Sequence, residues 1–334
     1  MSTTTAVSKH PPYEAPRSGW LSTIPSSWVP YAELMRLDRP NGFWYFYLPH
    51  LFGTLHAGAN QHLPVTSLFL ANLILIPGTL LMRGATCTWN DAVDAPFDRL
   101  VPRCRNRPVA RGAVSSQAAY IFTSFLSLLS LAMLMALPRY SILYALPAIA
   151  GWALYPLAKR VTYYPQVVLG FPMAWGVFMG AVAVGANPFA ICQIDNMAEH
   201  KTDVSMYPLY ASNVLWTLFY EIIYSHQDVG DDTKAGVKNI VLLYRGRTKP
   251  LLIKLAIGQV LLLAAAGFLA EAGLFYWMCA VFGTAGTSVL IIAKVNLDVP
   301  EDCDWWFKYG CCGLTGGVIS LGLSGDYVTT MWGP

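Results

Sequence analysis

Residues 66–98 read TSLFLANLILIPGTLLMRGATCTWNDAVDAPFD, and this stretch contains both features that decide the fold. Segment 66–90 has a single charged residue, Arg83, and is long enough to cross a bilayer, because about 20 residues suffice for a transmembrane helix. The residues that follow, 90–98, hold an asparagine and three aspartates. This combination predicts a membrane helix that ends in an acidic cluster at the membrane surface.

The composition of the whole chain also predicts a membrane protein. Of its 334 residues, 55% are hydrophobic and 12% are charged, and the mean hydropathy is +0.43. Soluble globular domains carry about 25% charged residues, so a water-soluble fold of this length would lack the charges to cover its surface. The abundance of apolar residues excludes an intrinsically disordered chain. A net charge of +3 is too small to predict a nucleic-acid partner.

Apolar segments of membrane-spanning length recur along the chain, and we count nine of them. Their approximate bounds are 31–58, 66–90, 116–137, 141–158, 165–184, 208–227, 250–270, 273–293 and 305–324. The pattern predicts an all-α polytopic membrane protein with nine transmembrane helices in residues 31–325. We expect a flexible cytosolic tail in residues 1–30, with a surface-lying stretch around Trp20–Trp28, and a short C-terminal tail in residues 326–334.

Lysine and arginine are distributed unevenly between the two sides of this topology. With a cytosolic N-terminus, 19 of the 22 basic residues lie on the cytosolic side, Arg83 lies within the second segment, and only Arg139 and Lys201 lie opposite. The positive-inside rule therefore predicts this orientation, with the C-terminus on the other side of the membrane. Residues 1–30 resemble neither a secretory signal nor a mitochondrial presequence. We thus favour the endoplasmic reticulum or another internal membrane over the mitochondrial inner membrane.

Six of the 19 acidic residues lie in two short stretches, at the ends of the second and sixth apolar segments. In the first stretch, Asn90, Asp94 and Asp98 are four residues apart and therefore share one helix face. The second stretch, residues 228–232, reads Asp-Val-Gly-Asp-Asp. Like charges at this spacing destabilise a helix. A bound cation would remove this repulsion, so both stretches are candidate cation sites.

The type of ligand in these stretches predicts the type of cation and substrate. Oxygen ligands favour hard cations, and Mg²⁺ is commonly held by one or two carboxylates together with substrate phosphates. Basic residues follow both stretches, Arg103 and Arg107 after the first, Lys234 and Lys238 after the second. Together these features indicate a diphosphate attached to an apolar tail. The alternative, solvated loop charges paired with nearby arginines, explains a pair of matching clusters less well.

These motifs resemble those of the UbiA-type intramembrane prenyltransferases, and most closely the fungal meroterpenoid farnesyltransferases. The first stretch matches the family's N-D-x-x-D-x-x-x-D motif. Residues 224–238 resemble its Y-x-x-x-D-x-x-D-D-x-x-x-G-x-K motif, and residues 36–42 resemble its R-x-D-[RK]-P-x-G motif. The resemblance covers about residues 31–325, nearly the whole chain.

The resemblance implies helices around a cavity that opens laterally to the bilayer, and transfer of a prenyl group from its diphosphate to an aromatic acceptor. The implied Mg²⁺ ligands are Asn90, Asp91, Asp94, Asp98, Asp228, Asp231 and Asp232, and we expect Asp94, Asp98, Asp228 and Asp232 among them to be catalytic. The expected diphosphate-binding residues are Arg103, Arg107, Lys159 and Lys238. Arg36 is expected to bind an acceptor carboxylate, and an ion pair with Asp38 is the alternative.

Two polar residues beside the second motif have open roles. Glu221 lies inside an apolar segment, where an acidic residue is a functional candidate, and a buried pair with Arg83 or a tyrosine is the alternative. His226 is either a proton acceptor or a polar contact beside the aspartates. Ten aromatic residues are candidates for an apolar cavity wall, although most of them are expected to pack between helices: Trp44, Tyr45, Phe46, Tyr47, Phe171, Trp175, Phe178, Trp216, Phe219 and Tyr220.

For the substrates, we favour farnesyl diphosphate and a polyketide-derived phenolic acid. A 4-hydroxybenzoate polyprenyltransferase of quinone biosynthesis is the first alternative. A soluble isoprenyl diphosphate synthase also uses paired aspartate motifs, but the composition of this chain excludes it. A transporter with an acidic cation pathway is the third alternative, and the position of both clusters at one membrane face argues against it. The bilayer is the only further partner expected, and no obligate protein partner is inferred.

Overall fold

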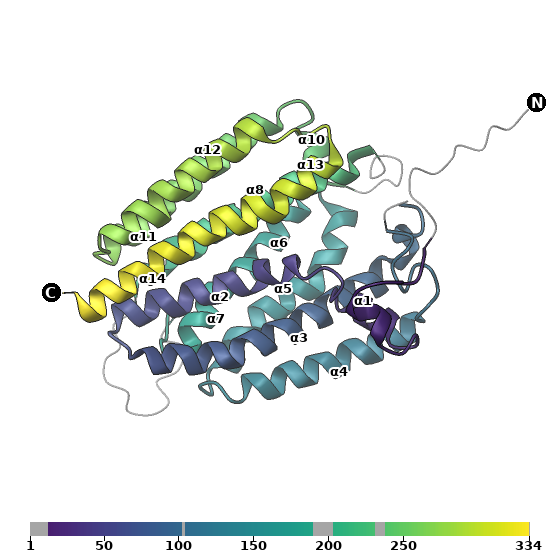
Figure 1. Ribbon diagram of the computed structural model, residues 1–334, viewed down its shortest axis with the longest axis horizontal. Coiled ribbons are helices and arrows are strands. Elements are labelled where there is room, and N and C mark those ends of the chain that lie inside the picture. The colour runs from purple at the N-terminus through teal and green to yellow at the C-terminus, as the bar shows by residue number, and fades with distance from the viewer. Residues whose placement is uncertain (1–12, 102–103, 190–202, 231–237, 334) are drawn as a thin grey trace, which may run out of the picture.

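The computed structural model describes residues 13–101, 104–189, 203–230 and 238–333, and within these ranges every regular element is a helix. This confirms the all-α fold class. The long helices are α2 (Asn41–Asn60), α3 (Val65–Asp98), α4 (Ser116–Leu134), α5 (Ser141–Val161), α6 (Pro165–Ala174), α7 (Gly176–Ala183), α8 (Met206–Ser225), α11 (Thr248–Leu269), α12 (Thr284–Lys294) and α14 (Gly316–Trp332) (Figure 1). The short elements are η1 (Trp20–Thr23), α1 (Val29–Leu34), η2 (His226–Asp228), α10 (Ile240–Leu243), η3 (Tyr276–Gly283), α13 (Pro300–Trp305) and η4 (Trp306–Thr315).

Six helical segments in the described ranges are long and apolar enough to cross a bilayer, which makes the chain an integral, multi-pass membrane protein. They are Val65–Asp98, Ser116–Leu134, Ser141–Ala158, Pro165–Ala183, Thr248–Leu269 and Tyr276–Lys294. The other three expected crossings correspond to α2, α8 and the joined η4 and α14. Histidine, asparagine, glycine and tyrosine residues lower the hydropathy of these three segments, so nine crossings remain a prediction.

Two expected boundaries differ from the structure. The segment expected at 31–58 is split, because the chain turns between α1 and α2, where Arg36 adopts a left-handed φ of 57° and Pro40 precedes the new helix. Residues 326–332, expected as a tail, are the last turns of α14. Tyr327 holds them in place, since it is buried and its hydroxyl donates a hydrogen bond to the Leu63 carbonyl at 2.7 Å.

The N-terminal segment packs against the helices from Tyr13 onward. The Tyr13 hydroxyl donates to a Glu33 carboxylate oxygen at 2.9 Å. Trp20 and Trp28 are 49% and 66% exposed. Exposed tryptophans are typical of the membrane–water interface, so the expectation of a surface-lying stretch stands as a prediction.

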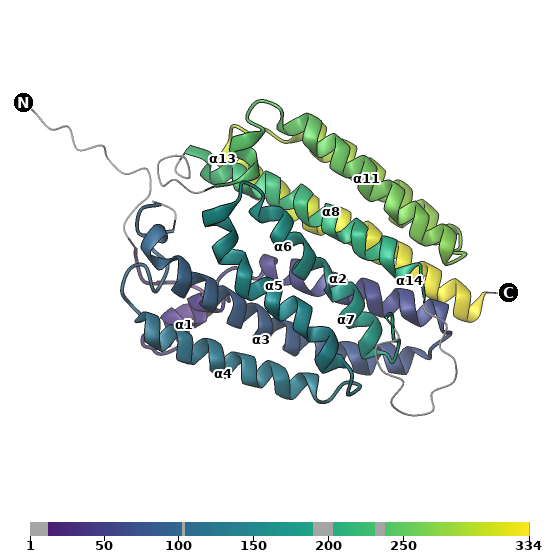
Figure 2. The same cartoon turned by 180° about the vertical axis from the view of Figure 1, so that it is seen from behind.

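Helices α2 and α7 pack closely against each other because each has a glycine at their interface. A Cβ atom on Gly53 would lie 1.8 Å from the Val177 carbonyl oxygen, and one on Gly180 would lie 1.9 Å from the His50 carbonyl oxygen. Only glycine allows backbones to approach so closely, a common arrangement between membrane helices. The acidic ends of α3 and α8 lie at one end of the bundle, beside α1 and α13, and the C-terminus lies at the opposite end (Figures 1 and 2). We call the first of these the motif end.

Candidate active site

A cavity of about 970 Å³ opens at the motif end, and both acidic motifs contribute to its wall. Asn90, Asp94 and Asp98 enter it from α3, and Asp228 enters it from η2. These residues are far apart in the sequence and meet because α3 and α8 end at the same side of the bundle. The structure therefore brings together four of the five described members of the two predicted clusters, all except Asp91.

The oxygen atoms on this wall fit a hard divalent cation. Asn90 Oδ1 is buried and has no hydrogen-bond partner in the described part of the chain, and leaving such an acceptor unsatisfied costs about 1–3 kcal/mol. Within the same ranges, no three acidic, histidine or cysteine side chains form a complete metal site. Mg²⁺ needs only one or two carboxylates when substrate phosphates supply further oxygens. Asn90, Asp94, Asp98 and Asp228 thus fit a shared site that substrate completes.

Several expected site residues lie outside the described part of the molecule. They are Arg103, Asp231 and Asp232, and the side chain of Lys159 is also not described. The ends of the second motif are nevertheless fixed by Gln166 of α6. Its Nε2 donates to Ser225 Oγ at 3.1 Å, and its Oε1 accepts from the Ile240 backbone N–H at 3.3 Å. Gln166 therefore holds the two ends of the segment that contains the second aspartate cluster.

Arg107 and Lys238 place positive charge on the cavity wall. Arg107 Nη1 lies 2.8 Å from Asp98 Oδ2. Burial works against the charge of Arg107, but the neighbouring Cys104, Asp91 and Asp98 outweigh it and raise the pKa of the guanidinium well above its usual value. Arg107 thus keeps its positive charge on the wall of the cavity, beside Asp98.

Asp91 does not line the cavity, unlike the other members of the first motif. It follows Asn90 directly and therefore points about 100° away around the helix. Its carboxylate is fully buried, with Oδ1 2.5 Å from Arg36 Nη2 and 3.5 Å from Arg107 Nη1. Both guanidinium groups lie against Oδ1, whereas Oδ2 is buried and has no hydrogen-bond partner among the described residues, so the expected role of Asp91 as a metal ligand stays a prediction. The geometry of Oδ1 indicates a buried bridge between two arginines.

Arg36 pairs with Asp91, whereas Asp38 pairs with Arg39 at 3.2 Å. The alternative of an Arg36–Asp38 ion pair is therefore wrong. Burial opposes the charge on Arg36, but the Asp91 carboxylate outweighs it and raises the pKa of the guanidinium above its usual value. Arg36 also lines the cavity, as its expected contact with an acceptor requires.

Arg83 fixes the loop that carries Arg36. Its guanidinium donates to the Arg36 carbonyl at 3.1 Å and to the Arg39 carbonyl at 2.8 Å. A Cβ atom on Gly42 would lie 2.7 Å from Arg83 Nη2, so glycine leaves the room that this contact needs. Arg83 is thus a structural support of the loop.

Glu221, the acidic residue inside α8, lines the cavity.

His226 faces away from the cavity. Its Nε2 lies 3.1 Å from Thr248 Oγ1, and burial lowers the pKa of its imidazole. Of its two proposed roles, the polar contact agrees with this position.

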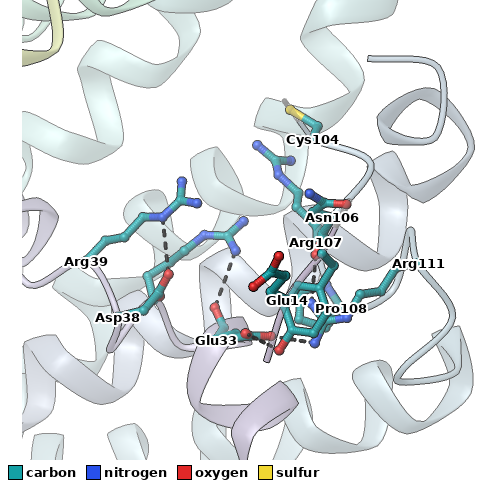
Figure 3. Close-up of a pocket in the computed structure, with 11 residues that line it drawn as sticks. Glu14, Glu33, Asp38, Arg39, Cys104, Asn106, Arg107, Pro108 and Arg111 are labelled. Atoms are coloured by element: carbon teal, nitrogen blue, oxygen red, sulfur yellow. Dashed lines mark hydrogen bonds and ion pairs between the residues drawn. The ribbon is translucent and has the colours of Figure 1, made fainter. Parts of the chain in front are cut away.

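A second, polar pocket of about 390 Å³ adjoins the cavity at the motif end (Figure 3). It shares five lining residues with the cavity: Arg36, Asp38, Arg39, Cys104 and Arg107. Tyr13 of the N-terminal segment forms part of its wall, where the Arg111 guanidinium lies 3.7 Å from the centre of its ring. Arg111 also pairs with Glu33 at 2.6 Å. We call this pocket the vestibule.

Aromatic rings form part of the cavity wall. Tyr45 lies 3.9 Å from Tyr220 and 4.6 Å from Phe307, measured between ring centres, and its hydroxyl donates to the Phe307 carbonyl at 2.5 Å. Of the ten aromatic candidates, Tyr45, Phe46 and Tyr220 line the cavity. Sequence reasoning missed Trp152 and Phe307, which also line it. No motif surrounds either residue, so no signal in the sequence pointed to them.

Comparison with known proteins places this arrangement in a family. Residues 46–312 match the model of the UbiA prenyltransferase family. The chain is 34% identical to the prenyltransferase ascA of Acremonium egyptiacum (89% of this chain, 85% of the relative) and 36% identical to the mitochondrial 4-hydroxybenzoate polyprenyltransferase of Saccharomyces cerevisiae (94% and 80%). A UbiA homologue from Archaeoglobus fulgidus, solved with GPP and Mg²⁺, has the same fold, with a TM-score of 0.62, 18% identity and coverage of 90% of this chain and 99% of that chain. The chain belongs to the UbiA prenyltransferase family and is a prenyltransferase.

Proposed function

We propose that this prenyltransferase transfers a farnesyl group from farnesyl diphosphate to an acidic aromatic acceptor, a polyketide-derived phenolic acid, and that it requires Mg²⁺. One observation carries the proposal: Asn90, Asp94, Asp98 and Asp228 of the two acidic motifs, the basic residues Arg107 and Lys238, and an aromatic wall surround a single cavity. This arrangement offers a polar end for a diphosphate and an apolar end for its tail. The Archaeoglobus fulgidus homologue solved with GPP and Mg²⁺ supports a prenyl diphosphate as the donor and Mg²⁺ as the metal.

The acidic residues and the basic residues act at the diphosphate. Asn90, Asp94, Asp98 and Asp228 would hold Mg²⁺, which, when bound, neutralises the charge that develops on the leaving diphosphate. Asp231 and Asp232 are proposed to complete the second motif. Arg107 and Lys238 hold diphosphate oxygens, and we retain Arg103 and Lys159 in this group. Charged donors fixed in advance stabilise a leaving group without reorganisation during the reaction.

The aromatic wall acts at the carbon that reacts. The bond between the allylic carbon and the diphosphate oxygen breaks, and its electron pair leaves with the diphosphate. The acceptor ring then forms the new bond to that carbon and loses a proton. Tyr45, Tyr220 and Phe307 present rings that stabilise positive charge. They also exclude water, which would otherwise capture the allylic cation.

Arg36 is the proposed contact for the acceptor carboxylate. It lines both the cavity and the vestibule, so an acceptor that enters through the vestibule meets it beside the diphosphate site. Asp91 engages one nitrogen of the guanidinium, and Nη1 donates to the Glu33 carbonyl at 3.3 Å. A guanidinium has five N–H groups, so donors remain for a carboxylate. In this arrangement Asp91 positions both Arg36 and Arg107.

A second acceptor, 4-hydroxybenzoate, has specific support in the similarity to the yeast enzyme. Membranes that contain the protein would be incubated with Mg²⁺, farnesyl diphosphate or a longer polyprenyl diphosphate, and a panel of phenolic acids that includes 4-hydroxybenzoate. We expect product from farnesyl diphosphate and an alkyl-substituted phenolic acid. Efficient use of 4-hydroxybenzoate with the longer donor would assign the chain to quinone biosynthesis instead. Absence of product from every combination would refute the proposed function.

We further propose nine crossings, with the motif end on the cytosolic side of an internal membrane. The distribution of basic residues, 19 against 2, supports this orientation, and α14 carries the C-terminus to the end opposite the motifs (Figure 1). A topology reporter fused after Pro334 should therefore report the side opposite the cytosol. A cytosolic signal would exclude this arrangement.

A further inference from the structure

We propose that residues 13–18 form a strap across the vestibule and that Tyr13, which holds this strap in place, determines how large an acceptor can reach Arg36. Tyr13 and Glu14 form part of the vestibule wall. They lie outside the part of the chain that matches the family model, residues 46–312. The inference rests on the proposed function in one respect, because it assumes that the acceptor enters through the vestibule.

The vestibule lies between two walls that come from different parts of the chain. One wall consists of the end of α1 and the loop before α2, residues 33–39, and the other consists of residues 104–111, which follow α3. Leu34 and Val109, one from each wall, are buried in the same apolar cluster with Ala92 of α3. This cluster fixes the two walls relative to each other.

Tyr13 contacts both walls at once. Its hydroxyl donates to Glu33 Oε1 at 2.9 Å, and the Arg111 guanidinium lies 3.7 Å from the centre of its ring. Arg111 and Glu33 also pair with each other at 2.6 Å, and their side chains are only 13% and 12% exposed. A charge-assisted hydrogen bond and a cation–π contact therefore join Tyr13 to a pair of side chains that is already in place. Through these contacts the strap spans the space between the walls.

The rest of the strap is held less firmly than Tyr13. Among the described residues, no backbone hydrogen bond joins residues 13–18 to a helix. The chain turns at Gly19, which has a left-handed φ of 79° and would have no atom within 4 Å of a Cβ. Leu21, two residues later, is buried and anchors η1. A segment with so few contacts opens at a low cost in free energy, so the strap can open about Gly19 when Tyr13 is released.

The position of the strap predicts a selection of acceptors by size. The vestibule has a volume of about 390 Å³ with Tyr13 in its wall, and Arg36 lies where the vestibule meets the cavity. A small acceptor can pass beside the closed strap. A bulkier acceptor requires the strap to open, which breaks both contacts of Tyr13. The strap therefore disfavours large acceptors and has little effect on small ones.

Two variants of Tyr13 and a readout without turnover test whether the strap closes the vestibule. Tyr13→Ala removes both contacts, whereas Tyr13→Phe keeps the ring and removes only the hydrogen bond. The rate at which N-ethylmaleimide modifies Cys104, which lines the vestibule and is 8% exposed, would be followed by mass spectrometry. We expect modification about tenfold faster in Tyr13→Ala than in the wild type, since a hydrogen bond to a charged group alone shifts an equilibrium by about that factor. Tyr13→Phe should have an intermediate rate.

Acceptor kinetics then test the selection by size. The purified protein would be assayed with Mg²⁺, farnesyl diphosphate and two phenolic acids, one without a further substituent and one with a long alkyl chain. In Tyr13→Ala, the ratio of kcat/KM for the large acceptor to that for the small one should rise about tenfold, because opening no longer breaks the contacts of Tyr13. The KM for farnesyl diphosphate should stay unchanged.

Trp20→Ala is the matched control. Trp20 is an aromatic residue of the same N-terminal segment and is 49% exposed, but it does not line the vestibule. Its rate of Cys104 modification and its acceptor ratio should equal those of the wild type. Equal rates of Cys104 modification in the wild type and Tyr13→Ala, or an unchanged acceptor ratio in Tyr13→Ala, would overturn the inference. A wild type that yields no product from any acceptor would refute the proposed function instead, and the rates of Cys104 modification would still decide whether the strap closes the vestibule.

Discussion

Replacing Asp91 by asparagine distinguishes a buried bridge from a metal ligand. Asp91 is fully buried, and its Oδ1 lies 2.5 Å from Arg36 and 3.5 Å from Arg107. Asparagine keeps the shape of the side chain and one hydrogen-bond acceptor but removes the negative charge. Two buried guanidinium groups then lose a shared counter-charge, so the variant should be less stable even when no metal is present.

The size of the effect follows from the surroundings of the two arginines. Removing one partner of a buried ion pair costs about 3–5 kcal/mol. Arg107 keeps Asp98 at 2.8 Å, and the Arg36 side chain is 16% exposed, so the lower value, about 3 kcal/mol, applies. At roughly 2 °C per kcal/mol for a large chain, Tm should fall by about 6 °C.

Thermal unfolding of the purified protein in detergent with EDTA measures this change. Asp38→Asn is the control, because the Asp38–Arg39 pair is much more exposed than Asp91, with 27% and 64% of the two side chains accessible. Such a pair contributes at most about 1 kcal/mol, so the control should melt within about 2 °C of the wild type. The reasoning is refuted if Asp91→Asn melts like the wild type in EDTA and instead needs about tenfold more Mg²⁺ for half-maximal activity, as expected for a lost metal ligand.

Four further variants, one of them with a control, test the site and its scaffold. Asp94→Ala and Asp228→Ala should each lower kcat by at least about 10²–10³-fold while protein remains in the membrane, and near wild-type turnover at saturating Mg²⁺ in either would refute the shared site. Arg36→Gln should raise KM for a carboxylated acceptor roughly ten- to a hundredfold, from a lost contact of about 1.5–3 kcal/mol, and an equal rise in KM for farnesyl diphosphate would contradict the assignment. Gly180→Ala should destabilise the protein by at least about 1–3 kcal/mol, because its Cβ would lie 1.9 Å from a backbone oxygen. Gly317→Ala on α14 is the control, since a Cβ atom there would have no atom within 4 Å, and this variant should melt at or above the wild-type Tm.

The sequence predicted the part of the site whose residues recur at the spacing of one helical turn. Asn90, Asp94 and Asp98 recur every four residues, so helical geometry alone placed them on one face, and they do line one cavity. The same geometry separates Asp91 from that face. Its partner Arg36 lies 55 residues away, and a contact of that kind depends on tertiary packing and not on local spacing.

The sequence did not predict the helix break before α2 or two of the aromatic residues that line the cavity. Pro40 and Gly42 mark the break before α2, yet the surrounding apolar residues suggested one continuous segment from 31 to 58. Trp152 and Phe307 line the cavity because α5 packs against α6 and η4 packs against α2 and α8. Aromatic residues occur throughout this chain, so their type gave no means to select these two in advance.

The most direct test of the proposed activity is to measure both products of the reaction at once. The purified protein, depleted of divalent metal and then supplied with Mg²⁺, farnesyl diphosphate and the best acceptor of the phenolic panel, would be assayed for free diphosphate and for prenylated acceptor. We predict equal amounts of the two products, formed only when Mg²⁺ is present and lost in both Asp94→Ala and Asp228→Ala. Undiminished transfer without divalent metal, or diphosphate release with no prenylated product, would contradict the account.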